Sequence, residues 1–225
     1  MTSPANGSTT LGHDDDTGGP SVRLLVVDDH PAVRVGLCEL LDDQPDFVVT
    51  GAASSAEEAL ALASDATVDV AIVDYHLGRL NGLWLSQKLK RRADPPAVVI
   101  YSAYCDGLLT AASVIAEAAA LISKRAPPDE LFAAIRASAR GGTARLPPLP
   151  ATTVETVRHR LSTGEQTIFG MLLAGFDRPA IADRLGLPAA ELESQLHRML
   201  AVFDAETQSA TALPGPVAAP DQAGP

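Results

Sequence analysis

Five residues whose side chains suit metal and phosphate chemistry each end a short apolar run of the sequence. In chain order they are Asp28, Asp29, Asp74, Ser102 and Lys124. Three carboxylates within several ångströms of one another repel by kilocalories at intermediate dielectric, so such a cluster needs a cation or a bound proton. Carboxylate oxygens favour Mg²⁺, which also binds phosphate oxygens. An aspartate beside Mg²⁺ is therefore a candidate nucleophile for phosphoryl transfer.

Alternating strands and helices would bring these five residues to one place. Short apolar runs predict buried strands at 22–27, 47–52, 68–73, 97–102 and 119–123. The patterns between them predict helices at 31–42, 54–64, 82–92, 107–116 and 127–139. Five such units in a row predict an α/β fold with a doubly wound (βα)5 parallel sheet. Ligands of these sheets bind outside the carboxyl ends of the strands, so the five side chains are expected to meet at one edge.

The order of these residues resembles that of a known family. The pattern VVDDHP…VDYHLGRLNG…VIYSA…LISKR is similar to the receiver domain of bacterial two-component response regulators, over about residues 22–139. The resemblance implies that Asp74 accepts a phosphoryl group, which Ser102 and Lys124 sense. It also implies that Mg²⁺ is held by a set of oxygen ligands, namely Asp28, Asp29, Asp74 and the backbone carbonyl of His76.

The resemblance also implies the partners and limits of this chemistry. The donor would be a cognate histidine kinase or a small acyl phosphate. The receiver would assist only its own phosphoryl transfer and dephosphorylation, so the chain is not expected to be an enzyme. Phosphatases of the haloacid-dehalogenase type also use a strand-end aspartate with Mg²⁺. They need a second Asp two residues after the nucleophile, and His76 stands at that position.

Position 121 departs from the receiver pattern. Receivers usually carry Tyr or Phe three residues before the lysine, and this ring swings inward on activation; here the residue is Leu121. The usual switch between a hydroxyl and an aromatic ring is therefore expected to be altered. Tyr101 and Tyr104, which flank Ser102, are candidate substitutes.

A second, smaller all-α domain is predicted after the sheet. The stretch RGGTARLPPLPATT is rich in Pro, Gly and Thr and predicts a linker. Helical patterns follow at 154–160, 162–174, 177–184 and 188–203. The predicted divisions are a disordered tail at 1–20, a receiver domain at 21–139, a linker at 140–154, a helical domain at 155–210 and a disordered tail at 211–225.

The helical segment resembles the LuxR-type helix-turn-helix of NarL/FixJ regulators. The similarity covers residues 161–203 and includes Leu161, Ser162, Glu165 and the motif IADRLGL. In that family the recognition helix lies in the major groove of DNA. The resemblance implies binding to promoter DNA as a homodimer or heterodimer. Its candidate DNA contacts are Arg178, Arg184, Glu193, Ser194, His197 and Arg198.

The recognition helix departs from the family in its charge. Glu193 stands where the family has a near-standard lysine, Glu191 where it usually has Thr, and Gln195 where it usually has His. A glutamate repels phosphates, and among the bases only cytosine edges accept it. Two hypotheses therefore stay open. The domain binds DNA and controls transcription, or a degenerate helix-turn-helix acts through protein–protein contacts, including heterodimers, with weak or no DNA binding.

Composition limits the remaining possibilities. The net charge is −11, and no segment carries the basic excess of an electrostatic nucleic-acid binder. The N-terminus lacks the apolar stretch of a signal peptide. The run AASVIAEAAALI is shorter than a membrane span and is interrupted by Glu117. Cys38 and Cys105 lack metal-ligand spacing. We therefore expect a cytoplasmic protein with no membrane partner.

Overall fold

The computed structural model describes residues 21–141 and 146–211, with side chains up to residue 203, and contains the predicted parallel sheet. Its strands are β1 (Val22–Val27), β2 (Phe47–Ala53), β3 (Val70–Asp74), β6 (Ala97–Ser102) and β7 (Ala120–Ser123). They lie in the order β2-β1-β3-β6-β7, and all neighbours are parallel. The strand order reverses between β1 and β3, which is where sheets of this type bind ligands. The predicted doubly wound fold is confirmed.

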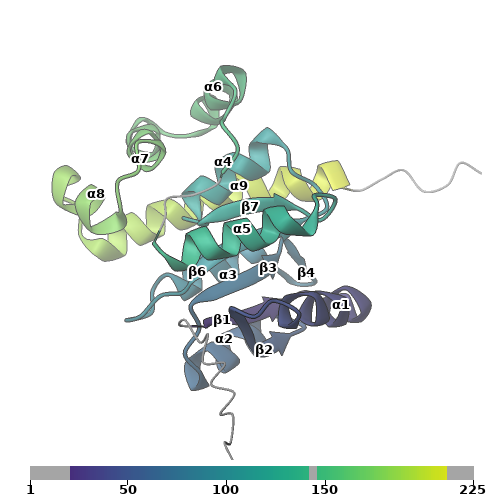
Figure 1. The fold of residues 1–225 in the computed structure, drawn as a ribbon. Helices are drawn as coiled ribbons and strands as arrows, with labels where there is room; N and C mark the ends of the chain where they lie inside the picture. The colour runs from purple at the N-terminus through teal and green to yellow at the C-terminus, as the bar shows by residue number, and fades with distance from the viewer. Residues whose placement is uncertain (1–20, 142–145, 212–225) are drawn as a thin grey trace, which may run out of the picture.

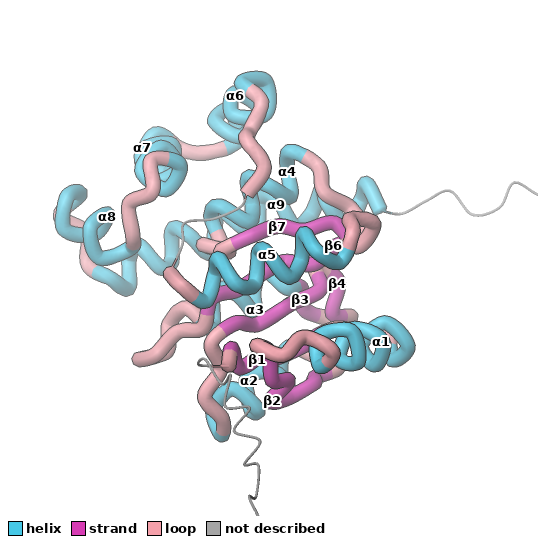
Figure 2. Tube along the Cα trace, in the orientation of Figure 1, coloured by secondary structure: helices cyan, strands magenta, loops and turns pink. Residues whose placement is uncertain are grey.

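Helices cover both faces of the sheet (Figure 2). On one face lie α1 (Pro31–Asp42) and α5 (Pro128–Ala139); on the other lie α2 (Ala56–Asp65), α3 (Gly82–Leu89) and α4 (Gly107–Ile115). Successive residues of a strand point to opposite faces, so Val26 and Ile72 pack with α1 and α5, while Val27 and Val73 pack on the other side. Both faces of the strands are therefore buried, which explains their continuous apolar runs.

Local sequence signals explain where most of these helices begin. Ser55, Asn81 and Asp106 are N-caps whose side chains accept hydrogen bonds from backbone N–H groups of α2, α3 and α4, respectively. Pro31 and Pro128 occupy the first turns of α1 and α5, where a missing N–H has no cost.

The structure differs from the sequence prediction in a hairpin and in the bounds of several elements. A small antiparallel hairpin, β4 (His76–Leu77) with β5 (Leu80–Asn81), follows β3 and turns through Gly78, whose φ is +69°. It was not predicted because its strands are too short to show a period. Helix α3 ends at Leu89 rather than at 92, and Ser55 caps α2 so that this helix begins at Ala56 rather than at 54.

Four helices form the C-terminal region: α6 (Ala151–Arg160), α7 (Thr163–Leu173), α8 (Arg178–Leu185) and α9 (Ala189–Thr211). Helix α7 begins with a capping box between Ser162 and Glu165, and α8 ends on Gly186 with a φ of +63°. Helix α6 begins directly after Pro150 and so includes the last residues of the predicted linker. Helix α9 continues past 203 to Thr211. The predicted disordered tails, residues 1–20 and those beyond 211, lie outside the described residues.

The C-terminal helices pack on one side of the receiver region. Helix α9 lies beside α4, and α6 and α7 also contact α4 (Figure 1). One hydrophobic cluster continues from Leu109 and Ile115 of α4 to Leu192, Leu196 and Met199 of α9. Within the part of the chain that the structure describes, no helix is both long and apolar enough to cross a membrane.

Candidate functional site

An acidic pocket forms at the carboxyl ends of β1 and β3. Val27 pairs with Val73 in the sheet register, so the residues that follow them, Asp28 and Asp74, stand side by side. Both residues are almost completely buried, with 1% and 5% of their surface exposed. Asp29, at the start of the following loop, offers a carboxylate oxygen within 4.8 Å of the ligand atoms of the other two. The strand ends thus bring the three predicted carboxylates together.

Lys124 bridges the two buried carboxylates. Its Nζ lies 2.6 Å from Oδ2 of Asp28 and 2.8 Å from Oδ2 of Asp74. Burial lowers the pKa of Lys124, but its bonds to Asp28 and Asp74 outweigh burial and hold the pKa above its ordinary value. Burial raises the pKa of Asp74, and the ammonium of Lys124 opposes that rise. One ammonium thus faces several carboxylates, which leaves an excess of negative charge in the pocket.

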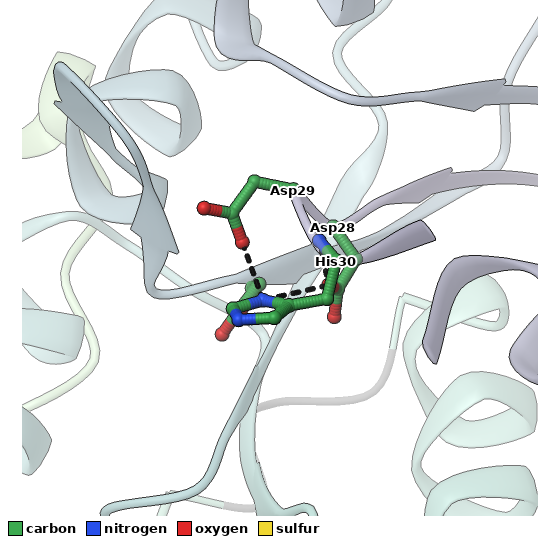
Figure 3. Close-up of side chains that lie close together, drawn as sticks. Asp28, Asp29 and His30 are labelled. Atoms are coloured by element: carbon green, nitrogen blue, oxygen red, sulfur yellow. Dashed lines mark hydrogen bonds and ion pairs between the residues drawn. The ribbon is translucent and has the colours of Figure 1, made fainter. Parts of the chain in front are cut away.

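His30 joins the acidic group from its solvent side. Its Nδ1 lies 2.7 Å from Oδ1 of Asp29 and 3.6 Å from Oδ1 of Asp28 (Figure 3). Its backbone N–H donates a 2.9 Å hydrogen bond to Asp28, which fixes that carboxylate. The sequence analysis did not assign a role to this histidine. The available signal was its position directly after the aspartate pair.

Ser102 ends β6 on the neighbouring strand and is completely buried. Its Oγ accepts a 3.2 Å hydrogen bond from the backbone N–H of Tyr104, and its carbonyl accepts one from the backbone N–H of Lys124 at 2.8 Å. Residue 101, directly before it, pairs with Asp74 in the register of β3 and β6. Ser102 and Lys124 therefore belong to the same strand-end edge as the carboxylates.

Leu121 and the two tyrosines that flank Ser102 lie in different environments. Leu121 is buried in β7 as part of the core and carries no polar group. The ring of Tyr101 lies 5.9 Å from Nζ of Lys124, and burial raises the pKa of its hydroxyl. Tyr104 is largely exposed. An aromatic ring thus borders the pocket from β6 instead of β7.

The segment after Asp74 shapes the rest of the pocket. His76 begins β4, its backbone bonds to the Asp74 carboxylate, and its ring contacts that of Tyr75 edge-on. A side chain at Gly82 would collide with the backbone carbonyl of Asp74. Glycine at this position therefore lets α3 begin in close contact with the backbone of Asp74.

The donor set fits Mg²⁺. Carboxylate oxygens are the ligands this ion prefers, and the pocket has more negative charge than Lys124 can neutralise. Asp28, Asp29 and Asp74 would hold the ion together with the backbone carbonyl of His76. The nitrogen of His30 is a softer ligand than Mg²⁺ prefers, and it already bonds to Asp29.

The predicted DNA contacts do not form one exposed surface in this structure. Arg178 and Glu193 are bonded to each other, with 2.7 Å between Nη1 and Oε1. Glu193 also pairs with Arg91 of the receiver region at 2.6 Å, and Arg178 also pairs with Glu117. The sequence analysis missed Arg91 and Glu117, because no local pattern connects residues so far apart in the chain.

The other predicted contacts are more exposed. The guanidinium of Arg184 lies over the ring of Phe176 at 4.4 Å, and the hydroxyl of Ser194 donates to the backbone carbonyl of Ala190. Arg198 lies 3.6 Å from Glu165 and is largely exposed. His197 lines an open groove with Ser194 and Arg198, and the opposite wall is formed by Lys88 and Arg91 of the receiver region.

Comparisons with known proteins point in the same direction as the geometry. The family model described as "Response regulator receiver domain" matches residues 24–136. The DNA-binding transcriptional activator DevR/DosR of Mycobacterium tuberculosis is 30% identical over 210 residues, which cover 85% of this chain and 93% of that protein.

Two solved structures extend the comparison to the fold. A LuxR-family two-component response regulator from Aurantimonas sp. SI85-9A1 is 27% identical, with a TM-score of 0.54 over 62% of this chain and 99% of that one. RcsB of Salmonella enterica serovar Typhimurium, solved bound to a promoter, is 19% identical, with a TM-score of 0.54 over 81% of this chain and 92% of that one. The second likeness concerns the fold alone.

Proposed function

The chain belongs to the response regulator family and is of the LuxR type, and from this premise we propose that it accepts a phosphoryl group on Asp74 and thereby controls transcription. The observation that carries the proposal is the pocket in which Asp28, Asp74 and Lys124 are in direct contact at the strand ends. With a cation such as Mg²⁺ held by the surplus carboxylates, the ammonium of Lys124 could pair with an anionic group at the same strand ends. We propose the receiver at 21–139 and the helical domain as the two functional parts; the helical domain, expected at 155–210, would begin earlier, at Ala151, so that it includes the whole of α6.

The transfer step assigns a role to each residue of the pocket. An oxygen of the ionised Asp74 carboxylate attacks phosphorus, and the bond from phosphorus to the donor breaks. Its electron pair leaves with the imidazole of a histidine kinase or with the carboxylate of an acyl phosphate. Mg²⁺, when bound by the oxygen ligands of the pocket, supplies positive charge to the transferring oxygens. Lys124 and the Ser102 hydroxyl then bind the phosphoryl oxygens from the β6–β7 side.

The signal has a short path from the pocket to the C-terminal helices. Ser102 is followed by a loop that ends at Asp106, the N-cap of α4. Helix α4 in turn packs against α9. A change in the position of Ser102 or Lys124 on phosphorylation would therefore move the N-terminal end of a helix on which the C-terminal region rests.

Intact mass measurement tests the phosphorylation. The full-length protein is incubated with acetyl phosphate and Mg²⁺, and we expect it to gain the mass of one phosphoryl group. Asp74→Asn should abolish the gain, whereas Asp65→Asn, at the exposed end of α2, should leave it unchanged. A gain that persists in Asp74→Asn would contradict the assignment of the acceptor.

A DNA titration tests the output and separates the two hypotheses for the helical domain. The protein is titrated against its own upstream region at low salt, before and after phosphorylation. Sequence-selective binding that strengthens with the mass gain supports transcriptional control, by a homodimer or a heterodimer. Full modification without binding would instead favour protein–protein output, which the acidic residues Glu191 and Glu193 already suggest.

A further inference from the structure

A cavity of about 740 Å³ lies at the end of the sheet opposite the acidic pocket. Two alanines at the amino ends of strands line it: Ala97 begins β6, and Ala119 directly precedes β7. Ser102, at the other end of β6, belongs to the edge that carries the acidic pocket. Cavities of roughly 300–1,000 Å³ hold small molecules in proteins. The structure thus offers a ligand a second place, separate from the proposed site of phosphoryl transfer.

The walls of this cavity are mainly apolar. Their larger apolar side chains come from three parts of the chain: Val114 from α4, Leu146 and Leu149 from the segment between α5 and α6, and Leu172 and Phe176 from α7 and the turn that follows it. An apolar group that enters the cavity gains free energy because it leaves water. The cavity therefore suits a ligand with an apolar body and not one that is polar throughout.

Lys90 brings a positive charge to this apolar cavity. Two carboxylates also line the cavity, and both have partners. Glu117 pairs with Arg178, while Asp177, the N-cap of α8, accepts a hydrogen bond from the backbone N–H of Ala180. For the ammonium of Lys90, by contrast, the described residues provide neither an ion pair nor a hydrogen bond. Within the described chain, Lys90 is therefore the charged group of this cavity that lacks a direct partner.

The position of Lys90 makes an unpaired charge costly. The residue directly follows α3 and is partly buried. Burial lowers the pKa of Lys90; the carboxylate of Glu117 opposes this effect, and the guanidinium of Arg178 adds to it. A charged group that is removed from water needs a counter-charge. An anionic group in the cavity would supply the counter-charge that the described chain does not provide at close range.

We propose that the cavity binds a small organic acid, whose carboxylate pairs with Lys90 and whose apolar body packs against Leu149 and Leu172. A pair between an ammonium and a carboxylate is strong when both are shielded from water. A neutral apolar molecule would leave Lys90 unpaired, and inorganic phosphate would leave the apolar walls in contact with water. A ligand with two negative charges would bring one of them towards Glu117 and Asp177. The cavity thus favours a ligand with one carboxylate and an apolar chain or ring.

Isothermal titration calorimetry of the full-length protein tests this binding, with octanoate as the probe. We expect one octanoate to bind per chain. Octan-1-ol has the same apolar chain without the charge, and we expect it to bind at least about tenfold more weakly because it cannot form the ion pair. Octanoate that does not bind, or that binds no more tightly than octan-1-ol, would overturn the proposal.

Lys90→Met tests the assigned cation, because methionine keeps an unbranched apolar side chain and removes the charge. It should weaken octanoate binding by about tenfold or more and change octan-1-ol binding little. Without ligand, the variant should melt at no lower temperature than wild type, because an unpaired charge has been removed, so loss of binding is not loss of folding. Lys88→Met is the matched control, since Lys88 lies in α3 and borders a different groove, and its octanoate affinity should stay at the wild-type value. Equal octanoate affinity of Lys90→Met and wild type would contradict the assigned pairing.

Leu149→Trp tests the location of the apolar body. Leu149 lies in the segment before α6 and is partly buried, so a larger side chain there takes up space in the cavity. We expect octanoate and octan-1-ol to lose affinity together in this variant, unlike in Lys90→Met. Unchanged affinity for both would place the binding elsewhere and overturn the assignment of the cavity. These measurements involve neither Asp74 nor DNA, so their result is independent of the proposed phosphorylation and output.

Discussion

The pocket at the strand ends depends on a balance between like charges and a single ammonium. Asp28 and Asp74 are nearly fully buried, and both contact Lys124. Ionised carboxylates at this depth need a counter-charge, because their solvation by water is lost. A cation bound in the pocket would therefore share with Lys124 the neutralisation of these carboxylates.

Replacing Lys124 by Ala should destabilise the protein by about 3 kcal/mol, the usual cost of leaving buried charges unpaired. Mg²⁺ should restore part of this loss in the variant, because the ion neutralises the same carboxylates. Urea unfolding with and without Mg²⁺ measures both effects. Arg125→Ala, at the exposed neighbouring position, is the control and should change stability by less than about 0.5 kcal/mol. Equal stability of Lys124→Ala and Arg125→Ala would contradict this account.

The close packing around Gly82 predicts the effect of adding a side chain there. A Cβ at this position would meet the Asp74 carbonyl oxygen and the side chain of Val73. We expect Gly82→Ala to destabilise by roughly 1–3 kcal/mol and to slow phosphorylation, because the strand must shift. Gly36→Ala is the matched control. A Cβ there meets nothing within 4 Å, and alanine favours α1, so this variant should be up to about 1 kcal/mol more stable. A similar response of both variants would refute the steric argument.

At the scale of elements, a bidentate ion pair joins the first residues of β1 to the residue that precedes β3. Arg23 donates from Nε and Nη2 to both oxygens of Asp69, at 3.0 Å and 2.6 Å, and its backbone N–H also donates to Asp69 at 2.8 Å. The side-chain bond to Arg23 holds the pKa of Asp69 below its usual value. This clasp lies at the end of the sheet opposite the acidic pocket.

Because the pKa of Asp69 is lowered in the folded state, the direction in which this ion pair's contribution to stability changes with pH can be predicted. The folded state favours the ionised carboxylate, so its contribution is present above the ordinary pKa of an aspartate and is lost as pH falls through the lower folded pKa. Asp69→Asn should remove this contribution, worth about 0.5–1 kcal/mol for a partly exposed pair, at neutral pH and not at acidic pH. Denaturant midpoints between pH 7 and pH 2 measure the difference. A difference from wild type that grows as pH falls would have the wrong sign.

The helices and strands also show which features could be predicted from sequence patterns. The bounds of β1 and α1 match the prediction because each begins and ends with a local signal, an apolar run or a helical proline. The start of α6 was wrong because the linker was inferred from composition, whereas Pro150 directly precedes a helix. The convergence of the carboxylates followed from the rule that parallel strands share a carboxyl edge. The bond between His30 and Asp29 did not follow, because it depends on how one side chain turns.

At the scale of the whole molecule, the two parts share a single hydrophobic cluster. Leu109 and Ile115 of α4 belong to the same cluster as Leu196 and Met199 of α9. The sequence did not predict this contact. An apolar stripe along a helix shows which face is buried and not which element buries it. The paired arginines and glutamates at the boundary were likewise invisible, because ion pairs between distant residues have no period.

The shared cluster predicts one cooperative unfolding transition. Trp84 is the one tryptophan of the chain and lies in α3 beside Leu200 of α9, so its fluorescence reports on the receiver and on its contact with α9, while circular dichroism reports on all helices. The two curves should coincide in wild type. Leu196→Ala, in the fully buried part of α9, should lower stability by about 2–4 kcal/mol by both probes. Leu173→Ala, at a largely exposed position, should change it by under about 0.5 kcal/mol. Fluorescence and circular dichroism curves that do not coincide would show two independent units.

Helix α4 is buried on two sides, and this limits which segments can be exchanged with a related regulator. One side of the helix packs on the sheet and the other supports α6, α7 and α9, so nearly every position on it is enclosed. At Gly107 even a methyl group would meet Thr153 of α6. A receiver grafted from a related regulator would bring an α4 shaped for a different neighbour. Chimeras that join at the connecting segment after α5 should therefore fold poorly unless α4 travels with the C-terminal helices. The unit of exchange in this protein is larger than either domain.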